Sequence, residues 1–393
     1  MTPDPGAAQR RVGMVAGETS GDLLAGAVLQ GLRQADPAMA CAGVGGPAMA
    51  AAGFDRWWDV SELSVMGYAE VLRAYPRLLR MRRALGDRLL DWRPDVFVGV
   101  DAPDFNLDLE ARLREGGIRV VHFVSPSIWA WRGERIEKIR RSVDHMLLVF
   151  PFETEIYARA GIAATYVGHP LADAIPLHAD CEGARLRLGL DAGRTTVALL
   201  PGSRAGEVKH MGETFVRTAA WLHARRPELQ FVLPAAGEAL YERLQETIAA
   251  MRLPDGLRLT LVEGRSHEAL AAADTVLVAS GTATLETALF RKPMVIAYRM
   301  AWLSHRIMRK RGYLPWIGLP NILAGESLVP EFIQDRATPE AMGAALLAQL
   351  DDDAGRQRIA ARFEAMHHEL RRGCAQQAAA VLMELTDGPR ARR

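Results

Sequence analysis

Two short apolar runs, one in each half of the chain, each lead through a turn of small residues into a helical pattern. Residues 12–16 run into GETSGD at residues 17–22, and residues 275–279 run into SGTATLE at residues 280–286. Such a turn directs backbone N–H groups and a helix N-terminus toward an anion, usually a phosphate. The pair predicts two open α/β domains facing one cleft, which suits an enzyme that brings a nucleotide-linked donor to an acceptor.

Strand-like runs alternate with helical patterns through most of the chain, as is typical of parallel sheets covered by helices. Several runs are apolar at consecutive positions, as expected for strands buried on both faces. The predicted strands span residues 12–16, 95–100, 119–124, 145–150, 195–200, 230–234, 257–262, 275–279 and 294–298, and later helices span residues 326–334, 341–350 and 354–385. We expect an N-terminal domain over residues 1–172, a C-terminal domain over residues 173–352 and a helical segment over residues 353–393.

The composition is that of a soluble globular chain. Its 393 residues are 49% hydrophobic and 24% charged, and the net charge of +1 gives no global field that would attract nucleic acid. Cys41, Cys181 and Cys374 form no metal-ligand pattern and no even disulfide set, which favours a reducing compartment. No run resembles a signal peptide or the ~20 apolar residues of a membrane span, so any membrane contact is expected to be peripheral.

Asp101 is the strongest catalytic candidate in the first half. It follows a buried strand in the segment GVDAPDFN, and open α/β sheets place their ligand crevice at the carboxyl ends of strands. A carboxylate there can take a proton from an attacking hydroxyl. The alternative is a helix cap, a role that Asp104 fills at least as well.

Two other loops are predicted to leave the same edge. The turn at residues 17–22 is either a ligand site or a packing turn capped by Ser20 or Asp22. The loop SPSIWAWR at residues 125–132 carries two tryptophans and an arginine, which are costly to expose without a function. Its alternative is that both indoles pack under a helix predicted at residues 134–141.

In the second half, the segment LPGSRAGE ends a strand with Arg204, which can contact a phosphate through two N–H groups. Its alternative is a surface ion pair with Glu207. Residues 280–282 fit a diphosphate, and Glu286 lies about one and a half turns into the helix, where it can accept from both ribose hydroxyls. The alternative for Glu286 is a capping box. Asn321 is either a phosphate or base ligand or a turn residue.

Two stretches mix arginines with large apolar residues and contain almost no acids, at residues 65–83 and 298–316. This pattern is typical of a helix lying in an anionic membrane surface. The alternative is a core helix with a solvated basic face. Pro76 is predicted to break the first stretch into two helices. The residues expected to touch the membrane are Val65, Met66, Val71, Leu72, Arg73, Leu78 and Leu79.

Taken in order, nine motifs resemble those of the lipid-A-disaccharide synthase family. They are GETSGD, VMG, GVDAPDFN, SPSIWAWR, VGHPL, LPGSR, ASGTATLE, KPMVIAYR and LPN with LAG, and they run from about Gly13 to past Val329. Each motif alone is weak evidence, whereas nine in register over most of a chain are highly specific.

The resemblance implies a GT-B glycosyltransferase with two Rossmann-like domains, parallel sheets facing a central cleft, and long C-terminal helices. The donor would be UDP-2,3-diacylglucosamine, the acceptor 2,3-diacylglucosamine 1-phosphate (lipid X), and the product the β-1,6 lipid A disaccharide 1-phosphate, with UDP released. It also implies catalysis without a metal or other cofactor, a cytoplasmic enzyme bound peripherally to the inner face of the cytoplasmic membrane, and a homodimer. The C-terminal segment is expected either to pack back or to be exchanged between protomers.

In that reaction the acceptor hydroxyl attacks with inversion, Asp101 is the candidate general base and Glu18 is the second candidate. The residues expected to bind UDP are Ser203, Arg204, Ser280, Gly281, Thr282, Glu286 and Asn321, and those expected to bind the acceptor are Ser20, Gly21, Ser125 and Trp129.

Three other functions are compatible with two nucleotide-style loops. A UDP-N-acetylglucosamine 2-epimerase would act on a soluble sugar and would not need the basic–apolar stretches. A nicotinamide-dependent dehydrogenase is disfavoured because the first loop lacks GxGxxG. A non-catalytic nucleotide-sugar module would leave Asp101 without a role.

Overall fold

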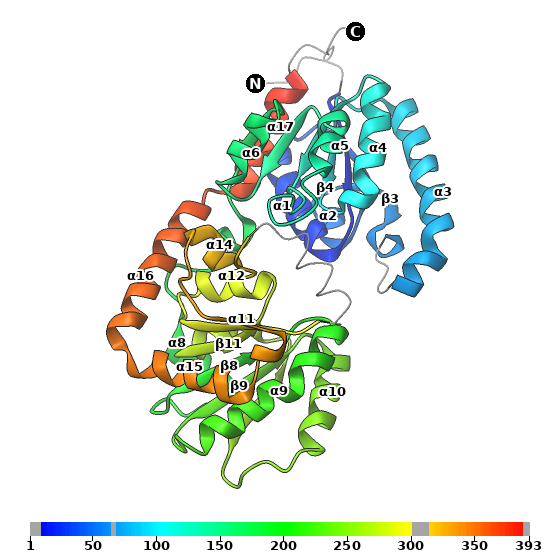
Figure 1. The fold of residues 1–393 in the computed structure, drawn as a ribbon. Helices are drawn as coiled ribbons and strands as arrows, with labels where there is room; N and C mark the ends of the chain where they lie inside the picture. The colour runs from blue at the N-terminus through cyan, green and yellow to red at the C-terminus, as the bar shows by residue number, and fades with distance from the viewer. Residues whose placement is uncertain (1–8, 64–67, 301–313, 388–393) are drawn as a thin grey trace. The chain divides into compact units, whose positions relative to one another are not determined.

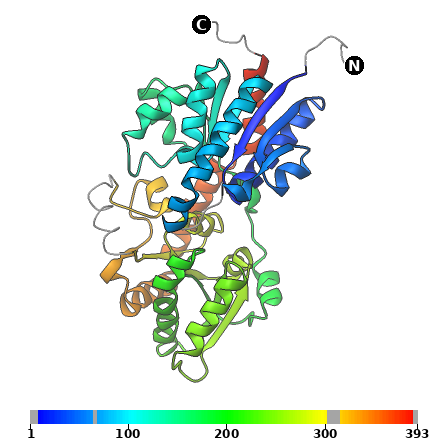
Figure 2. The same ribbon diagram turned by 90° about the vertical axis from the view of Figure 1, so that its right-hand side faces the viewer.

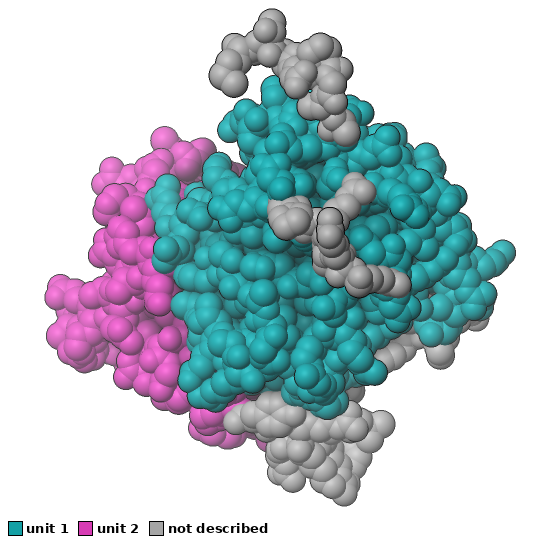
Figure 3. Space-filling model, turned by 90° about the horizontal axis from the view of Figure 1, so that it is seen from above, with its two compact units in different colours: residues 1–173, 370–393 teal, residues 174–369 magenta. Residues whose placement is uncertain are grey.

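The computed structural model describes residues 9–63, 68–300 and 314–387. The chain divides into two compact units, one formed by residues 1–173 with 370–393 and the other by residues 174–369 (Figure 3). Each unit is a parallel sheet with helices on both faces (Figures 1 and 2). The α/β class with two parallel sheets, predicted from the alternating pattern, is therefore confirmed.

Unit 1 contains both the first strand and the last helix of the described chain. Its elements are β1 (Arg11–Ala16), α1 (Thr19–Ala35), β2 (Ala40–Gly45), α2 (Pro47–Ala51), β3 (Asp55–Asp59), the 3₁₀ turn η1 (Val60–Glu62), α3 (Tyr68–Trp92), β4 (Val96–Val100), α4 (Pro103–Glu115), β5 (Arg119–Phe123), α5 (Arg135–Ser142), β6 (His145–Leu148), α6 (Glu153–Arg159), β7 (Ala164–Tyr166), α7 (Pro170–Ala174) and α17 (Cys374–Asp387). Among the described residues its sheet has the order β3-β2-β1-β4-β5-β6-β7. Helix α1 packs against α2 and α17, whereas α4 packs against α3 and α5.

Unit 2 repeats the same plan. Its elements are α8 (Cys181–Leu188), β8 (Thr196–Leu200), α9 (Ala205–His223), β9 (Gln230–Ala235), α10 (Glu238–Ala249), β10 (Arg258–Glu263), α11 (Ser266–Ala272), β11 (Thr275–Ala279), α12 (Thr282–Leu289), β12 (Met294–Tyr298), α14 (Leu319–Ala324), β13 (Glu331–Ile333), the 3₁₀ turn η2 (Gln334–Arg336), α15 (Pro339–Asp351) and α16 (Asp353–Leu370). Within the described ranges the sheet order is β10-β9-β8-β11-β12-β13. Helix α9 packs against α10 and α15, and α11 packs against α8.

The strand order of each sheet reverses direction once, between β1 and β4 in unit 1 and between β8 and β11 in unit 2. These strands pair in parallel, with Ala16 beside Val100 and Val278 beside Leu200. At such a reversal the helices that follow neighbouring strands go to opposite faces, which opens a crevice at the carboxyl ends. The two turns singled out in the sequence, at residues 17–22 and 280–286, both start at these points.

The central strands form where the sequence offers uninterrupted apolar runs. Every residue of β4 and of β11 is buried, as expected for strands covered on both faces. Strands β2, β3, β7 and β13 were not predicted. Strand β2 is rich in alanine and glycine, β3 is polar, and β7 and β13 have only three residues each. Gly43 shows why β2 lacks large residues, because a Cβ there would lie 2.1 Å from the Met14 carbonyl oxygen.

Three helix predictions were wrong. Helix α3 continues through Pro76, because Met81, Leu85 and Leu89 recur every four residues and anchor its later turns in the core. The helix predicted at residues 326–334 lies earlier in the chain, as α14. Helix α14 ends at Gly325, whose φ is +68°, and residues 331–333 form strand β13.

The single helix predicted over residues 354–385 is in fact α16 and α17. They are separated at Gly373, whose φ is +69°. A residue with this backbone conformation ends a helix.

Helix α17 is fixed to unit 1 by one carboxylate from the end of that unit's first segment. The Asp173 carboxylate accepts hydrogen bonds from the backbone N–H groups of Gly373 (2.9 Å) and Cys374 (2.6 Å), the first residues of the helix. Further along, a Cβ added at Gly31 of α1 would lie 2.9 Å from Ala379 Cβ. The two helices therefore approach closely, and Asp173 caps a helix that begins 200 residues later in the chain.

No helix within the described ranges is both long and apolar enough to cross a bilayer.

We predict that Asp173→Ala destabilises unit 1 at its C-terminal helix. Loss of a helix-capping carboxylate costs about 1–2 kcal/mol, so the free energy of unfolding in urea should fall by that amount. Hydrogen exchange should accelerate in α17 first. The control is Asp387→Ala, which removes an exposed ion pair between Asp387 and Arg10 and should change the unfolding free energy by less than about 0.5 kcal/mol. Equal effects of the two substitutions would contradict the capping role.

Candidate active site

Unit 2 has a cavity of about 350 Å³ at the carboxyl ends of β8, β9 and β11. Six of the seven residues predicted to bind UDP line it: Ser203, Arg204, Ser280, Gly281, Thr282 and Glu286. Glu207, Pro234, Gly264 and Ser266 also contribute to its wall. The structure thus gathers side chains from loops that lie far apart in the chain into one site at the topological switch point.

The turn between β11 and α12 has the geometry of an anion site. Gly281, at the N-cap of α12, has a φ of +142°, which only glycine adopts without strain. The first N–H groups of a helix have no intrahelical acceptor and carry the positive end of its dipole. Ser280 Oγ donates to the Ile317 carbonyl oxygen at 3.3 Å, and this hydrogen bond links the turn to the segment before α14.

The loop after β8 is held in shape by Glu207. Its carboxylate accepts from the N–H groups of Ser203 (3.0 Å) and Arg204 (3.3 Å). Gly202, with a φ of +126°, allows this approach, because a Cβ there would lie 2.4 Å from Glu207 Cβ. The ion pair weighed as an alternative role for Arg204 is present at 3.2 Å, but the arginine side chain is 75% exposed. Such a pair contributes little stability and leaves other guanidinium donors for a ligand.

Glu286 points to a histidine that the sequence did not single out. His267 Nε2 lies 3.4 Å from Glu286 Oε1, and this hydrogen bond raises the pKa of His267 even though burial lowers it. The alternative of a capping box for Glu286 was wrong, because the N-cap of α12 is Gly281, which has no side chain to take part, and Glu286 lies beyond the third residue of the helix. His267 is the second residue of α11 and lies 19 residues before its partner Glu286, so no local sequence signal marks the pair.

Asn321 occupies a different position from the other predicted UDP residues. It is fully buried in α14, where its amide nitrogen donates to Val329 O (2.9 Å) and Glu331 Oε1 (2.8 Å) and its oxygen accepts from Val329 N (2.9 Å). Glu331 also accepts from the N–H groups of Ile317 and Gly318. The side chain of Asn321 therefore organises the segment that supports Ser280, and any effect on UDP passes through that segment.

In unit 1, Asp101 lies in a strained turn at the switch point. Its φ is +53° and that of Ala102 is +45°, a region that non-glycine residues adopt at a cost of ~1–3 kcal/mol. Gly17 packs against this turn, since a Cβ added to it would lie 2.2 Å from Ala102 Cβ. Glu18 follows directly, so the two candidate bases lie on loops in contact with each other.

The capping alternatives for this region were wrong. The N-cap of α4 is Ala102, without a side-chain cap, and Asp104 instead pairs with Arg135 at 2.6 Å. Helix α1 has Glu18 at its N-cap, also without a side-chain cap. The Asp22 carboxylate does cap a helix, but it is α2, through the N–H groups of Gly46, Ala48 and Met49 at 2.7–3.1 Å.

The predicted acceptor residues divide into two groups. Ser20 is exposed beside Glu18, whereas Gly21 is buried, and a Cβ there would lie 3.7 Å from Val100 O. Ser125 and Trp129 belong to a buried network, with Ser125 Oγ 2.7 Å from Tyr157 Oη and Trp129 Nε1 donating to Glu153 Oε1 at 3.2 Å. The network fixes the loop at residues 125–132 from the interior of unit 1.

The alternative, in which both indoles of this loop pack under α5, does not describe their surroundings. Trp129 makes edge-on contacts with Phe150 and Phe152, at centroid distances of 6.3 and 5.3 Å. Trp131 is 37% exposed, with the Arg132 guanidinium 4.1 Å from its ring centroid. The two indoles thus differ in environment, one in an aromatic cluster and the other at the surface.

Of the residues expected to touch a membrane, Val65 and Met66 lie outside the described residues, as do residues 301–313 of the second basic–apolar stretch. Val71, Leu72 and Arg73 belong to α3, and Leu78 and Leu79 of the same helix are half-buried. Nearby, Tyr75 is 56% exposed.

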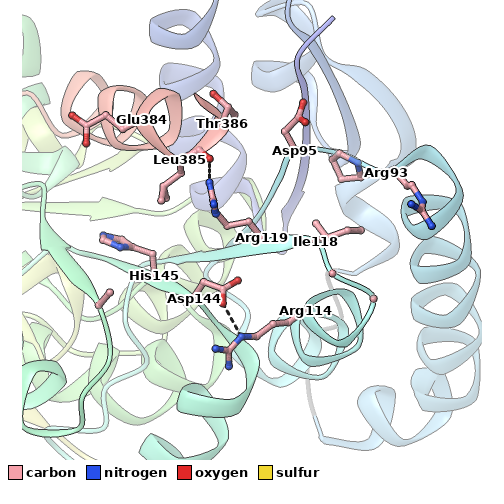
Figure 4. Close-up of a pocket in the computed structure, with 14 residues that line it drawn as sticks. Arg93, Asp95, Arg114, Ile118, Arg119, Asp144, His145, Glu384, Leu385 and Thr386 are labelled. Atoms are coloured by element: carbon pink, nitrogen blue, oxygen red, sulfur yellow. Dashed lines mark hydrogen bonds and ion pairs between the residues drawn. The ribbon is translucent and has the colours of Figure 1, made fainter. Parts of the chain in front are cut away.

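A larger cavity, of about 630 Å³, lies at the opposite edge of the unit 1 sheet, at the amino ends of β4, β5 and β6 (Figure 4). Figure 4 shows Arg119 directed at the Leu385 carbonyl and Arg114 paired with Asp144 at 2.8 Å. These bonds join α17 and α4 to the strands. Because ligands of open α/β sheets bind outside the carboxyl ends, size alone does not make this cavity the active site.

Solved structures share this architecture across the whole chain. UDP-N-acetylglucosamine 2-epimerase of Neisseria meningitidis, bound to UDP-N-acetylglucosamine, has a TM-score of 0.64 at 11% identity, covering 95% of this chain and 100% of that one. MurG of Acinetobacter baumannii has a TM-score of 0.59 at 14% identity, covering 96% and 100%. At these identities the likeness shows the fold alone. The two parallel-sheet units and this likeness define the GT-B fold.

The sequence comparisons are more specific. The profile of the lipid-A-disaccharide synthetase family matches residues 12–383. The lipid-A-disaccharide synthase of Burkholderia vietnamiensis is 52% identical over 380 residues, covering 96% of this chain and 97% of that protein. That of Cupriavidus pinatubonensis is 53% identical over 375 residues, covering 95% and 92%. The chain belongs to the lipid-A-disaccharide synthetase family, as its motifs predicted.

We predict that Glu153 makes stability depend on pH. Burial raises the pKa of Glu153 to about 7 from 4.5, despite the hydrogen bonds from Phe150, Ser125 and Trp129. The folded state therefore retains a proton that the unfolded state has lost. The resulting stabilisation is complete below pH 4.5 and is lost as the pH rises through about 7, by roughly 3 kcal/mol in total.

Urea unfolding at several pH values between 4.5 and 8 measures this dependence. Glu153→Gln should remove that part of the slope, whereas Glu155→Gln, which changes an exposed carboxylate on the same helix, should retain it. Parallel curves for wild type and Glu153→Gln would show that Glu153 does not hold the proton.

Proposed function

We propose that this chain condenses UDP-2,3-diacylglucosamine with 2,3-diacylglucosamine 1-phosphate to give the β-1,6-linked lipid A disaccharide 1-phosphate and UDP. The observation that carries the proposal is family membership over residues 12–383. The cavity of unit 2, lined by six of the seven predicted UDP residues, supports it independently. The epimerase alternative rests on a likeness of fold only.

In the proposed reaction the acceptor 6-hydroxyl attacks the anomeric carbon in line with the departing UDP, which inverts the configuration. Asp101 acts as the general base, and Glu18 on the contacting loop is the alternative. A carboxylate is a weak base toward an alcohol, but the hydroxyl becomes acidic as the new bond forms. Such assistance typically accelerates a reaction ~10²–10⁴-fold. The strained turn supports this assignment, because strain tends to be retained where function requires it.

Fixed backbone dipoles and the side chain of one cation stabilise the negative charge that develops on the leaving diphosphate. The N–H groups at residues 280–282 and the N-terminus of α12 provide the dipoles, and Arg204, on the rim of the cavity, provides the charge. Because the backbone dipoles are already in place, they need not reorganise during the reaction. Glu286 accepts hydrogen bonds from the ribose hydroxyls, and His267 orients it.

Both substrates carry acyl chains that do not leave a bilayer readily, so we place the enzyme at the inner membrane surface. The basic–apolar stretch at residues 65–83, with exposed Tyr75, is the proposed contact, and a homodimer is the proposed assembly. Sedimentation with anionic vesicles tests the first proposal, and analytical ultracentrifugation tests the second.

The decisive experiment is a mixed-micelle assay with the two acylated sugars in the presence of EDTA, followed by mass spectrometry. We expect both UDP and disaccharide. Asp101→Ala should abolish turnover while the Kd for UDP stays within twofold, since Asp101 is proposed to contact the acceptor. Glu18→Gln is the matched comparison. If Glu18→Gln rather than Asp101→Ala abolishes turnover, Glu18 is the base. UDP release without disaccharide would overturn the acceptor assignment.

A second prediction concerns the ribose. Glu286→Ala removes two proposed hydrogen bonds to a charged acceptor, so UDP should bind roughly 10–100-fold more weakly by calorimetry. Glu213→Gln, which changes an exposed carboxylate of α9 paired with Arg217, should leave the Kd unchanged. An unaltered Kd in Glu286→Ala would remove Glu286 from the nucleotide site.

A further inference from the structure

Next to the Asp101 turn lies a buried ionisable pair that the proposed reaction does not use. His122 of β5 and Glu110 of α4 are fully buried, and His122 Nδ1 lies 2.7 Å from Glu110 Oε1. Replacing such a pair by apolar residues is often neutral or stabilising, so its presence is weak evidence for a role in stability. The pair needs another explanation.

The sheet register places this pair beside the strand that ends in Asp101. His122 lies directly across from Gly99 of β4, and the backbone N–H of Asp101, just past the end of β4, donates to the carbonyl oxygen of Phe123, the residue after His122, at 2.8 Å. The packing requires glycine at position 99, because a Cβ there would lie 2.0 Å from Glu110 Oε1. Glycine thus admits the Glu110 carboxylate to the backbone that leads into the turn.

Asn106 connects the same helix to the turn itself. Its Nδ2 donates to the Asp101 carbonyl oxygen at 2.8 Å, and it lies four residues before Glu110, on the same face of α4. Asn106 Oδ1 and Glu110 Oε2 are buried and have no partner of hydrogen-bond geometry within the described ranges. Leaving a buried polar atom without a partner destabilises the folded state. Two such atoms on one face of α4, beside a strained turn, indicate polar side chains that are retained for function.

The charges in this cluster act on one another. Burial lowers the pKa of His122. The Glu110 carboxylate, Asp101 and a hydrogen bond with the Val124 backbone all raise it, and together they outweigh burial, so the net shift of the pKa is upward. Burial raises the pKa of Glu110, opposed by His122 and by Lys138 of α5, which itself pairs with Asp108. Both shifts favour retention of a proton by the pair, which titrates as a unit, and His122 is electrostatically coupled to Asp101.

We propose that His122 and Glu110 are positioning residues for Asp101, holding the strained turn and presenting a buried positive charge to its carboxylate. The inference rests on the proposed function, in which Asp101 is the base. Glu110 fixes the imidazole, the imidazole is coupled to the aspartate through its charge, and Asn106 holds the aspartate backbone.

The first test is the pH profile of disaccharide formation in His122→Asn and Glu110→Gln, with Glu115→Gln, an exposed position on the same helix, as the control. We expect kcat to fall tenfold or more with KM for the donor within twofold. The acidic limb of kcat/KM should move upward in both variants. The double variant should be no worse than either single one, since the two residues act as a unit. A loss of activity with an unmoved pH profile would overturn the proposal.

The second test does not depend on turnover. In protein labelled with ¹⁵N-histidine, the His122 ring signals are assigned by their loss in His122→Asn and titrated in wild type and in Asp101→Asn. We expect both ring nitrogens to be protonated at pH 7, and the titration to move to lower pH in Asp101→Asn. An unmoved titration would refute the coupling whether or not the chain forms the disaccharide. A moved titration without turnover would refute the proposed function alone.

Discussion

In each unit the candidate residues depend on one constraint, the parallel pairing of β1 with β4 in unit 1 and of β8 with β11 in unit 2. These pairs stand where each sheet reverses its winding, and their registers decide which loops meet. With Ala16 beside Val100, the Glu18 and Asp101 loops are in contact. With Val278 beside Leu200, the arginine loop and the glycine turn close around one cavity. A shift of one residue in either register would reverse the side chains on that strand and separate these groups.

Close approach at the strand ends accounts for the small residues in the motifs. Gly17 makes room for Ala102, Gly99 for Glu110 and Gly202 for Glu207. In each case the absent side chain admits a neighbouring element to the backbone of a loop at the carboxyl edge. Asp101 and Ala102, by contrast, adopt positive φ angles although neither is glycine. Packing from Gly17, Asn106 and the β5 strand end has to maintain that turn.

The sequence predicted the fold class, the central strands and the grouping of the nucleotide loops, because buried parallel strands leave long apolar runs and because their carboxyl ends share an edge. It did not predict β2 or β13, where alanine, glycine or brevity conceal the strand. It placed Asn321 among the UDP ligands, whereas burial gives its amide to Val329 and Glu331. His267, Glu153 and His122 were missed since each matters through a partner distant in sequence, and no local pattern encodes such a pair.

The capping of α17 by Asp173 also determines the order in which the chain can fold during synthesis. Unit 2 comprises residues 174–369 without interruption, whereas unit 1 needs residues 370–393 to complete it. As the ribosome releases the chain, unit 2 can therefore close first. The face of α1 that contains Gly31 stays uncovered until α17 emerges. Unit 1, although its synthesis begins before that of unit 2, is thus completed after it, with a helix face open to chaperones or to another nascent chain in the interval.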